Sequence, residues 1–345
     1  MKLSMSLNYS GDPKQLAKTA QDYERAGVDM VWVAELYSFD AVSLMGYLAA
    51  VTERMEIAAG ILPLYSRTPT LIGMTAAGVD ALSGGRCVLG LGASGPQVIE
   101  GWHGVPYDRP LGRTREIIDI CRQVWRREKV EHNGVSYQIP LPADQGTGQG
   151  KALKIINRPV RPDIPIYVAA LGPKNVALAA EKAEGWLPIF FHPDRANEVW
   201  WPDVEVGLAK RDEGLPPLEV VAGGTVSICS EDEAKRIRDA SRGMTALYVG
   251  GMGSKETNFY NQLFCRYGYE EEAAKIQELY LSGKRGEAEA LIPDDYLRAT
   301  TLAGDEGFVR ERIEAYRQAG VTRLSITPVG ENPLEIIEKV KAWAE

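Results

Sequence analysis

Three glycines follow a short apolar run in the stretch CVLGLGASGPQ at residues 87–97. The spacing Gly-x-Gly-x-x-Gly after a predicted strand is typical of a site that holds the pyrophosphate of a dinucleotide. That chemistry requires a long helix beginning at the third glycine, because the helix N-terminus supplies the N–H groups that bind phosphate. Pro96 follows Gly95 directly, and Gly101 and Gly104 come soon after, so no long helix is expected here.

The place of this motif in the chain also differs from that of a dinucleotide site. It follows the fourth predicted strand, and the acidic residues at about the required 20-residue distance, Glu116 and Asp119, fall in a predicted helix. An alternative is that the loop lies at the carboxyl end of a barrel strand, where small residues let a flat ring approach the backbone. A tight turn that needs glycine for positive φ explains the loop as well, so both interpretations remain open. The loop residues are Gly92, Ala93, Ser94 and Gly95.

Few other side chains are candidates for proton transfer or substrate binding. The three histidines and four cysteines lie far apart and lack zinc-ligand spacing, so no metal site is predicted. Histidine is the side-chain type best suited to proton transfer near neutral pH, so His103, in GWHGVPYD, could transfer a proton, although a histidine bonded to the backbone is the structural alternative. His192 follows the sixth predicted strand, and Tyr65 and Arg67 follow the third, where they could bind substrate or orient a loop.

The scaffold that positions these residues is predicted from alternating apolar runs and amphipathic helical patterns. Eight strands, nearly all followed by helices, favour an α/β fold, the (β/α)8 TIM barrel, in which the site lies at the carboxyl ends of the strands. A doubly wound open sheet is the alternative fold. The predicted strands are residues 3–9, 30–34, 57–64, 86–91, 164–170, 186–191, 218–229 and 322–329.

The chain of 345 residues exceeds the usual barrel length of about 250 by roughly 100. Two segments account for the excess: residues 98–160, which include a hairpin, and residues 231–305, a mostly helical insertion between strands seven and eight. No linker marks a second domain, so residues 1–345 are predicted to form a single barrel domain.

Charge and composition exclude several classes of partner. The formal net charge is -8 and no block of Lys and Arg occurs, so neither a nucleic-acid surface nor a polybasic membrane patch is expected. The first ten residues contain no apolar signal segment, and no apolar run approaches the roughly 20 residues that span a bilayer. These observations predict a cytoplasmic protein.

Several stretches together resemble the bacterial luciferase-like monooxygenase superfamily, and more narrowly its branch of coenzyme F420-dependent oxidoreductases. They are residues 32–35 (WVAE), 58–69 (AAGILPLYSRTP), 84–110 and 167–188, with the closing AGVTRLSITP also similar. The resemblance implies a (β/α)8 barrel of the bacterial luciferase-like type, a homodimer, and a flavin or deazaflavin at the carboxyl ends of the strands.

The resemblance also implies three sets of cofactor contacts. A bulge in strand three, often with a non-prolyl cis peptide, backs the ring and would fall at Gly60 and Ile61. The loop after strand four, residues 92–95, would contact the ring and ribityl chain. The loop after strand five would bind the cofactor phosphate through backbone N–H groups that precede a helix. That loop contains Ala169, Ala170, Leu171, Gly172 and Pro173.

This sequence departs from the related sugar-phosphate and alcohol dehydrogenases at the end of strand two. Those enzymes place Asp-His there, whereas this chain has Glu35, Leu36 and Tyr37. Glu35 could contact the ring or act as acid or base, and Tyr37 could donate a proton. The predicted reaction is hydride transfer between the C5 of F420 and a small organic substrate, such as reduction of an activated C=C or C=O. An FMN-dependent monooxygenase and a non-catalytic flavin-binding protein are the alternatives.

Overall fold

Eight parallel strands form a closed barrel in the computed structural model, which describes residues 1–8, 10–253 and 258–345. They follow one another around the barrel in chain order, and β12 pairs with β1 to close it, as the TIM-barrel prediction requires. The strands are β1 (Lys2–Ser6), β2 (Met30–Val33), β3 (Glu56–Ala59), β5 (Cys87–Gly92), β8 (Ile166–Ala169), β9 (Gly185–Leu187), β10 (Glu219–Ile228) and β12 (Arg323–Pro328). The first strand ends before Tyr9, which lies outside the described residues.

The third predicted strand is divided into two parts. A cis peptide bond between Gly60 and Ile61 separates β3 from β4 (Leu62–Pro63), which pairs with β5. The bulge and its cis peptide therefore occur where the family resemblance placed them. A short strand that the sequence did not predict, β11 (Leu302–Gly304), pairs with the end of β10. The predicted hairpin is present as β6 (His132–Asn133) and β7 (Gln138–Ile139).

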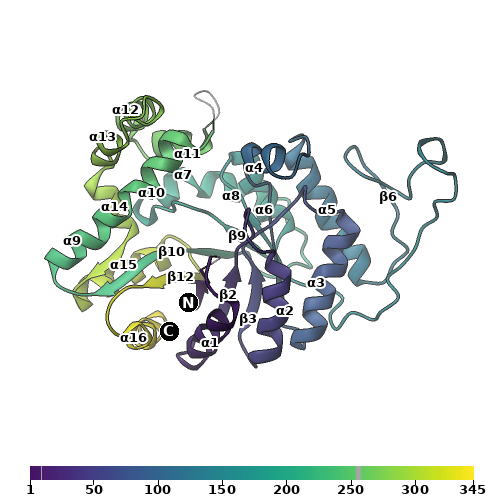
Figure 1. Ribbon diagram of the computed structural model, residues 1–345, viewed down its shortest axis with the longest axis horizontal. Coiled ribbons are helices and arrows are strands. Elements are labelled where there is room, and N and C mark those ends of the chain that lie inside the picture. The colour runs from purple at the N-terminus through teal and green to yellow at the C-terminus, as the bar shows by residue number, and fades with distance from the viewer. Residues whose placement is uncertain (9, 254–257) are drawn as a thin grey trace.

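Helices cover the outside of the barrel (Figure 1). Several begin at a side chain that accepts a hydrogen bond from the first turn, as Asp12, Asp40 and Asp305 do. The barrel helices are α1 (Pro13–Arg25), α2 (Ala41–Val51), α3 (Pro69–Ser83), α5 (Pro110–Trp125), α6 (Pro173–Lys182), α7 (Ala196–Val199), α8 (Trp201–Leu208), α15 (Glu306–Gln318) and α16 (Pro333–Ala344). None of the described helices is long and apolar enough to cross a bilayer.

Between β10 and β11 the chain forms a group of helices beside the carboxyl ends of the strands, at the upper left of Figure 1. They are α9 (Glu231–Ala240), α10 (Arg242–Ala246), a π-helical turn (Leu247–Gly251), α11 (Phe259–Arg266), α12 (Glu270–Leu281), α13 (Arg285–Ala290) and α14 (Asp294–Thr300). The other long segment contains α4 (Pro96–Gly101) and α5, and its part around β6 extends away from the barrel (Figure 1).

Two apolar layers hold the barrel together. The larger layer lies between the strands and the helices, and a smaller cluster fills the barrel interior. Alternate side chains along each strand belong to alternate layers, as the pleat of a strand requires. The interior cluster consists of Met30, Trp32, Ala58, Val88, Tyr167 and Val221. Beside this cluster Arg323, fully buried, pairs with Glu56 and Glu219.

Candidate functional site

The residues predicted to hold a cofactor come together at the carboxyl ends of β2, β3, β5 and β8. These four strands are consecutive neighbours in the barrel, so the loops that follow them meet at one side of its mouth. All the predicted positions there except Glu35, Ile61, Ser94 and Leu171 are glycine, alanine or proline, which leaves backbone exposed to a flat ligand. We call the members of this group nearest the strand ends, together with the neighbouring Ala34, the small-residue floor: Ala34, Gly60, Ile61, Gly92, Ala93 and Ala169.

Close approach of two strands explains why the motif needs glycine. A Cβ on Gly90 would lie 1.8 Å from the carbonyl oxygen of Ala59, and a Cβ on Gly92 would lie 2.9 Å from the Cδ1 of Ile61. A Cβ on Gly60 would press on the Trp32 side chain at 3.1 Å. The glycines therefore let β5 pack closely against the bulge. In a dinucleotide-binding motif the glycines instead make room for the pyrophosphate and its helix.

The loop after β5 has unusual backbone geometry. Ser94 has a φ of 59°, in the left-handed region that non-glycine residues rarely adopt. Gly95 is the N-cap residue of α4, which has only six residues and ends at Gly101. A short helix therefore begins where the sequence analysis expected no long one, and it does not provide the extended helix of a dinucleotide site.

The loop after β8 leaves a helix N-terminus open. Gly172 is the N-cap of α6 and offers no side-chain acceptor to the first turn. Nothing lies within 4 Å of the position that a Cβ on Gly172 would take. Among the described residues, no backbone acceptor lies within hydrogen-bond reach of the Leu171 and Gly172 N–H groups. Uncapped N–H groups and the positive end of the helix dipole suit an anion such as phosphate.

Glu35 and Arg67 form a buried ion pair across the mouth. The Arg67 guanidinium donates to both Glu35 oxygens, at 2.5 and 2.8 Å, and the Ala41 N–H donates to Glu35 Oε2 at 2.9 Å. The hydrogen bond to Glu35 is the main reason that the pKa of Arg67 is raised, in spite of partial burial. Because both carboxylate oxygens already accept hydrogen bonds, the geometry favours a positioning role for Glu35 over proton transfer.

Tyr65 orients a loop in this structure. Its ring is buried, and its hydroxyl donates to the carbonyl oxygen of Asp108 at 2.8 Å. The Arg113 guanidinium lies 5.2 Å from the centre of the Tyr65 ring and donates to Asp108. Of the two roles that the sequence left open for Tyr65, loop orientation is therefore the one that its contacts support. The same contacts occupy Arg113, one of the basic residues near the mouth.

Tyr37 and His103 lie on the loops after β2 and β5. The Tyr37 side chain is exposed, and its ring centre lies 6.3 Å from that of Trp102, next to His103 in the chain. His103 is half-buried, and its Nε2 atom is enclosed without a hydrogen-bond partner among the described residues. A buried ring nitrogen without a partner is available to bond a ligand or a water molecule. Both residues therefore remain candidates for proton transfer.

His192 follows β9 and is buried. Its exposed fraction is 4%, and its ring packs between those of Tyr267 and Tyr296. Burial lowers the pKa of His192, although Asp194 and Asp295 partly oppose this effect. Its Nδ1 atom, like Nε2 of His103, is enclosed without a hydrogen-bond partner among the described residues. A contact between His192 and substrate therefore stays a prediction.

Sequence reasoning missed an aromatic group beside the mouth. Phe190 follows β9 with a φ of 56°, and its ring packs edge-on against Tyr248 and Tyr260 at 5.2 and 5.8 Å. Tyr248 lies in the π-helical turn, a feature frequent at functional sites. Residues 190, 248 and 260 are far apart in the chain and follow no periodic pattern, so nothing in the sequence signalled that they meet. Strain at Phe190 marks this group as a candidate wall of the substrate site.

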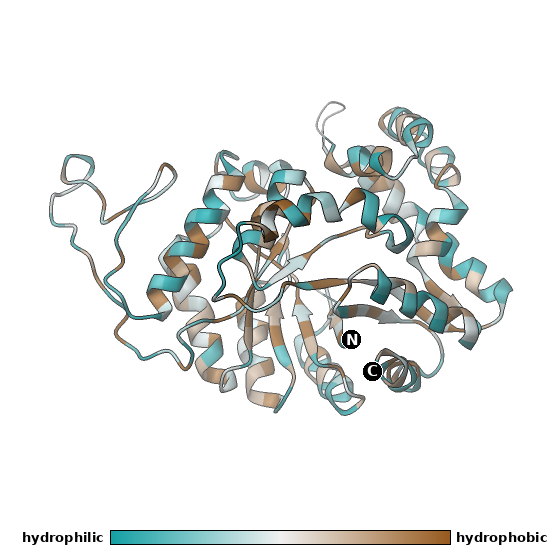
Figure 2. Ribbon diagram, turned by 180° about the vertical axis from the view of Figure 1, so that it is seen from behind, coloured by the Kyte–Doolittle hydropathy of each residue, from teal (hydrophilic) through white to brown (hydrophobic). Residues whose placement is uncertain are grey.

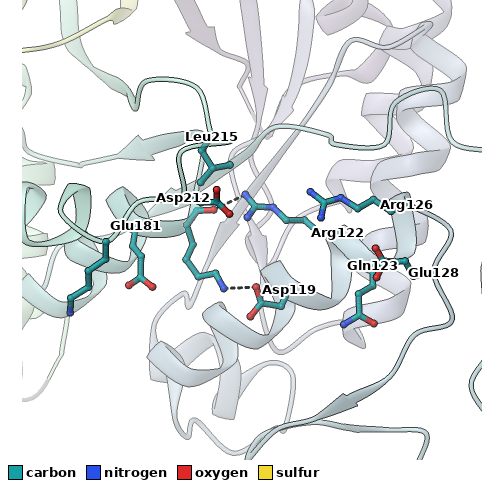
Figure 3. A pocket seen from close by; sticks show the side chains of 10 residues that line it. Asp119, Arg122, Gln123, Arg126, Glu128, Glu181, Asp212 and Leu215 are labelled. Carbon is teal, nitrogen blue, oxygen red and sulfur yellow. Dashed lines mark hydrogen bonds and ion pairs between the residues drawn. The ribbon is translucent and has the colours of Figure 1, made fainter.

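A polar pocket of about 370 Å³ lies elsewhere, among α5, α6 and the end of α8 (Figure 3). Its side chains come from the C-terminal ends of the helices, which run back toward the amino ends of the strands. Lys182 pairs there with Asp119, and charges of both signs line the pocket. It is therefore distinct from the barrel mouth. No cluster of metal-ligating side chains occurs in the part of the chain that the structure describes.

A barrel with a small-residue floor, an open helix N-terminus and a bulged third strand defines a class of ligand-binding (β/α)8 protein. The chain belongs to the luciferase-like monooxygenase family, whose model matches residues 1–323.

A Mycobacterium tuberculosis protein that carries the provisional name coenzyme F420-dependent oxidoreductase is 41% identical over 333 residues, which cover 95% of each chain. A 5,10-methylenetetrahydromethanopterin reductase of Archaeoglobus fulgidus is 28% identical and covers 92% of this chain and 90% of its own. The solved structure of the coenzyme F420-dependent tetrahydromethanopterin reductase of Methanopyrus kandleri has a TM-score of 0.78 at 26% identity, over 98% of this chain and 96% of its own.

Proposed function

We propose that this protein is a coenzyme F420-dependent oxidoreductase that transfers a hydride between the deazaflavin C5 and a small organic substrate. Reduction of an activated C=C or C=O is the reaction we propose. The observation that carries the proposal is the small-residue floor beside the open N-terminus of α6, in a chain 41% identical to a relative named for F420. The cofactor supplies the hydride, and the chain supplies orientation and a proton.

The residues present suit a flat ring that carries a phosphate-bearing side chain. Gly60, Ile61 and Gly92 would lie against the ring, where larger side chains would collide with neighbouring strands. Residues 169–173 would hold the phosphate through backbone N–H groups at the start of α6. Ala93, Ser94 and Gly95 would lie along the ribityl chain. These assignments support a deazaflavin and FMN alike, since both carry a ring, a ribityl chain and a phosphate.

The side chains at the mouth have distinct proposed roles. Glu35 holds Arg67 in place, and Arg67 orients the loop after β4 or contacts substrate. Tyr37 and His103 are the proposed proton donors. The Tyr37 side chain is exposed to solvent, and the Nε2 atom of His103 has no hydrogen-bond partner among the described residues. A proton donor is required since addition of a hydride to a carbonyl or an activated alkene leaves a negative charge.

Fluorescence titration of the purified protein with oxidised F420, and separately with FMN, tests the proposal. Tight binding of F420 with weak binding of FMN is the expected result, and a substrate screen with reduced F420 would follow. Preference for FMN would instead favour an oxygen-dependent monooxygenase of the same family. Binding of F420 without turnover of any substrate would favour a non-catalytic flavin-binding protein, and binding of neither would contradict the proposal.

We also propose that the protein is a cytoplasmic homodimer. Helices α2 and α3 lie side by side, and Figure 2 shows few hydrophilic positions on them. Helix α2 has no charged residue, and Asp80, the charged residue of α3, is fully buried. Apolar side chains are exposed on this pair of helices, which monomeric proteins rarely leave uncovered. We call them the α2–α3 face: Tyr47, Leu71, Met74 and Leu82.

A further inference from the structure

The barrel interior carries a row of hydroxyl side chains on the side opposite the small-residue floor. In β1, Leu3 and Met5 belong to the outer apolar layer, so Ser4 and Ser6 point into the barrel. The same alternation in β12 and β10 directs three more hydroxyls inward, since Leu324, Ile326, Ala222 and Val226 are in the outer layer. We call the five residues the hydroxyl row: Ser4, Ser6, Thr225, Ser325 and Thr327.

Strand register places these residues side by side. Thr225 is paired with Thr327 across β10 and β12, and Ser325 is paired with Ser4 across β12 and β1. Ser6 is paired with Trp32 of β2, whose ring belongs to the interior cluster. Neighbouring parallel strands lie about 4.8 Å apart, so paired hydroxyls can contact one ligand together.

The hydroxyl row has no hydrogen-bond partner in the part of the chain that the structure describes. Ser4 Oγ is fully enclosed without a partner, and so is the Nε1 atom of Trp32 beside Ser6. Thr225 and Ser325 are half-buried, while Ser6 and Thr327 are exposed. The row therefore runs from a closed interior to the open mouth. Buried polar atoms without a partner are rare and costly, which points to a bound molecule that completes their bonds.

The row is also free of formal charge. Among the described residues, the ionised interior side chains are Arg323, Glu56 and Glu219. Both carboxylates pair with Nη2 of Arg323, and its Nη1 atom is enclosed without a partner. Arg323 precedes Ser325 by two residues on β12, so it lies about 7 Å deeper in the barrel. A phosphate or carboxylate would gain no charge partner beside the hydroxyls, whereas a neutral group can both donate to them and accept from them.

We propose that the hydroxyl row is the substrate-recognition subsite, and that the substrate is an uncharged carbonyl compound with at least one further hydroxyl group. The proposal rests on the proposed function, in which the deazaflavin ring occupies the small-residue floor on the other side of the mouth. The carbonyl carbon of the substrate faces the deazaflavin ring. The hydroxyl group of the substrate lies against the inward faces of β10, β12 and β1.

A binding experiment on the F420-loaded protein tests this subsite. Three probes differ in one substituent: cyclohex-2-en-1-one, its 4-hydroxy derivative and its 4-carboxylate. Isothermal titration is carried out on the wild type, on Thr327→Val and Ser6→Ala, and on Thr147→Val, whose exposed hydroxyl lies in the loop after β7. Thr327→Val preserves shape and suits a strand, so the variant should fold, and Ser6→Ala provides a second test.

We expect the 4-hydroxy probe to bind best, and Thr327→Val or Ser6→Ala to weaken it roughly fivefold to tenfold, the effect of one neutral hydrogen bond. Binding of the unsubstituted enone and of F420 should change less than about twofold, and Thr147→Val should resemble the wild type. Stronger binding of the carboxylate, equal weakening of all probes, or no binding of any probe to the F420-loaded protein would overturn the subsite. Failure of the wild type to bind F420 would instead overturn the proposed function on which the subsite rests.

Discussion

At the level of single residues, the ion pair between Glu35 and Arg67 links two loops of the mouth. The two residues are 32 positions apart in the chain, yet Arg67 donates to both carboxylate oxygens. Their side chains are 7% and 15% exposed, so solvent screens the pair weakly. The sequence indicated that Glu35 and Arg67 were functional candidates, but their mutual contact gives each a more specific role.

Replacing Glu35 by Gln should lower the free energy of unfolding and the affinity for the cofactor. It should not change the pH dependence of turnover. The variant removes the carboxylate to which the partly buried Arg67 guanidinium donates and leaves only the more distant charge of Asp40, at a cost of about 2 kcal/mol in the free energy of unfolding. Arg67→Met should cost a similar amount, and the double variant should cost less than the sum. Urea denaturation measures the stabilities. A loss of the acid or base limb from the kcat–pH profile in Glu35→Gln would contradict the positioning role.

At the level of secondary structure, α6 offers a test that separates folding from ligand binding. Gly172 has the extended backbone of an N-cap residue, with φ -72° and ψ 147°, and no side chain meets that position. An Asp there would cap the helix and leave stability equal or higher by about 1 kcal/mol. Its carboxylate would also occupy the N–H groups proposed for the cofactor phosphate and repel that phosphate.

We therefore expect Gly172→Asp to retain its melting temperature and to lose F420 affinity by roughly tenfold or more, since an anion site has gained a negative charge. Fluorescence titration and thermal unfolding measure the two effects. Gly286→Asp, on the exposed helix α13 with nothing within 4 Å of its Cβ position, is the matched control. Unchanged F420 affinity in Gly172→Asp would place the phosphate elsewhere.

The loop after β9 depends on one hydroxyl from the helical segment. The Tyr267 hydroxyl accepts from Trp200 Nε1 and from the His192 N–H, and it donates to the carbonyl oxygen of Phe190. Tyr267→Phe should destabilise the protein by about 2–4 kcal/mol, because three buried polar groups lose their partner. Tyr269→Phe is the control, since that hydroxyl bonds the carboxylate of Asp295 near the surface. Similar denaturation midpoints for both variants would show that this loop does not depend on Tyr267.

His192 should make the stability of the same region depend on pH. Burial lowers its pKa in the folded protein, whereas the unfolded chain has a value of about 6.5. Between these two values the unfolded state binds more protons, so stability should fall as the pH falls below about 6.5. The glutamine in His192→Gln cannot be protonated in this pH range. The melting temperature of this variant should therefore fall less than that of the wild type between about pH 7.5 and pH 5.5. Equal losses in the two proteins would indicate that other groups control the acid sensitivity.

At the scale of the whole molecule, the proposed homodimer would form through the α2–α3 face. Met74 is 52% exposed and Leu82 is 67% exposed, and both lie on α3. The double variant Met74→Glu, Leu82→Glu places charges in an apolar contact and should convert a dimer into a monomer. Light scattering after size-exclusion chromatography measures the mass. Ile156→Glu, exposed in the extended segment near β6, should remain dimeric, and a monomeric wild type would refute the proposal.

The amino-acid sequence by itself determined the eight strands, most of their helices and the small-residue floor. Strand alternation, helix caps and glycine positions are local properties that act over a few residues, so the pattern carries them directly. Residues 60–61 and 92–95 also stood out because a family resemblance attached a cofactor to them. The prediction of a single domain over residues 1–345 stays a prediction.

Only the tertiary structure decided what each side chain contacts. Glu35 meets Arg67, Tyr65 meets the Asp108 carbonyl, and His192 lies beneath Tyr267 and Tyr296 because barrel closure brings distant loops together. The hydroxyl row arises in the same way, since β1, β10 and β12 are far apart in the chain and adjacent in the barrel. Burial and pairing depend on such long-range contacts, which no local pattern encodes.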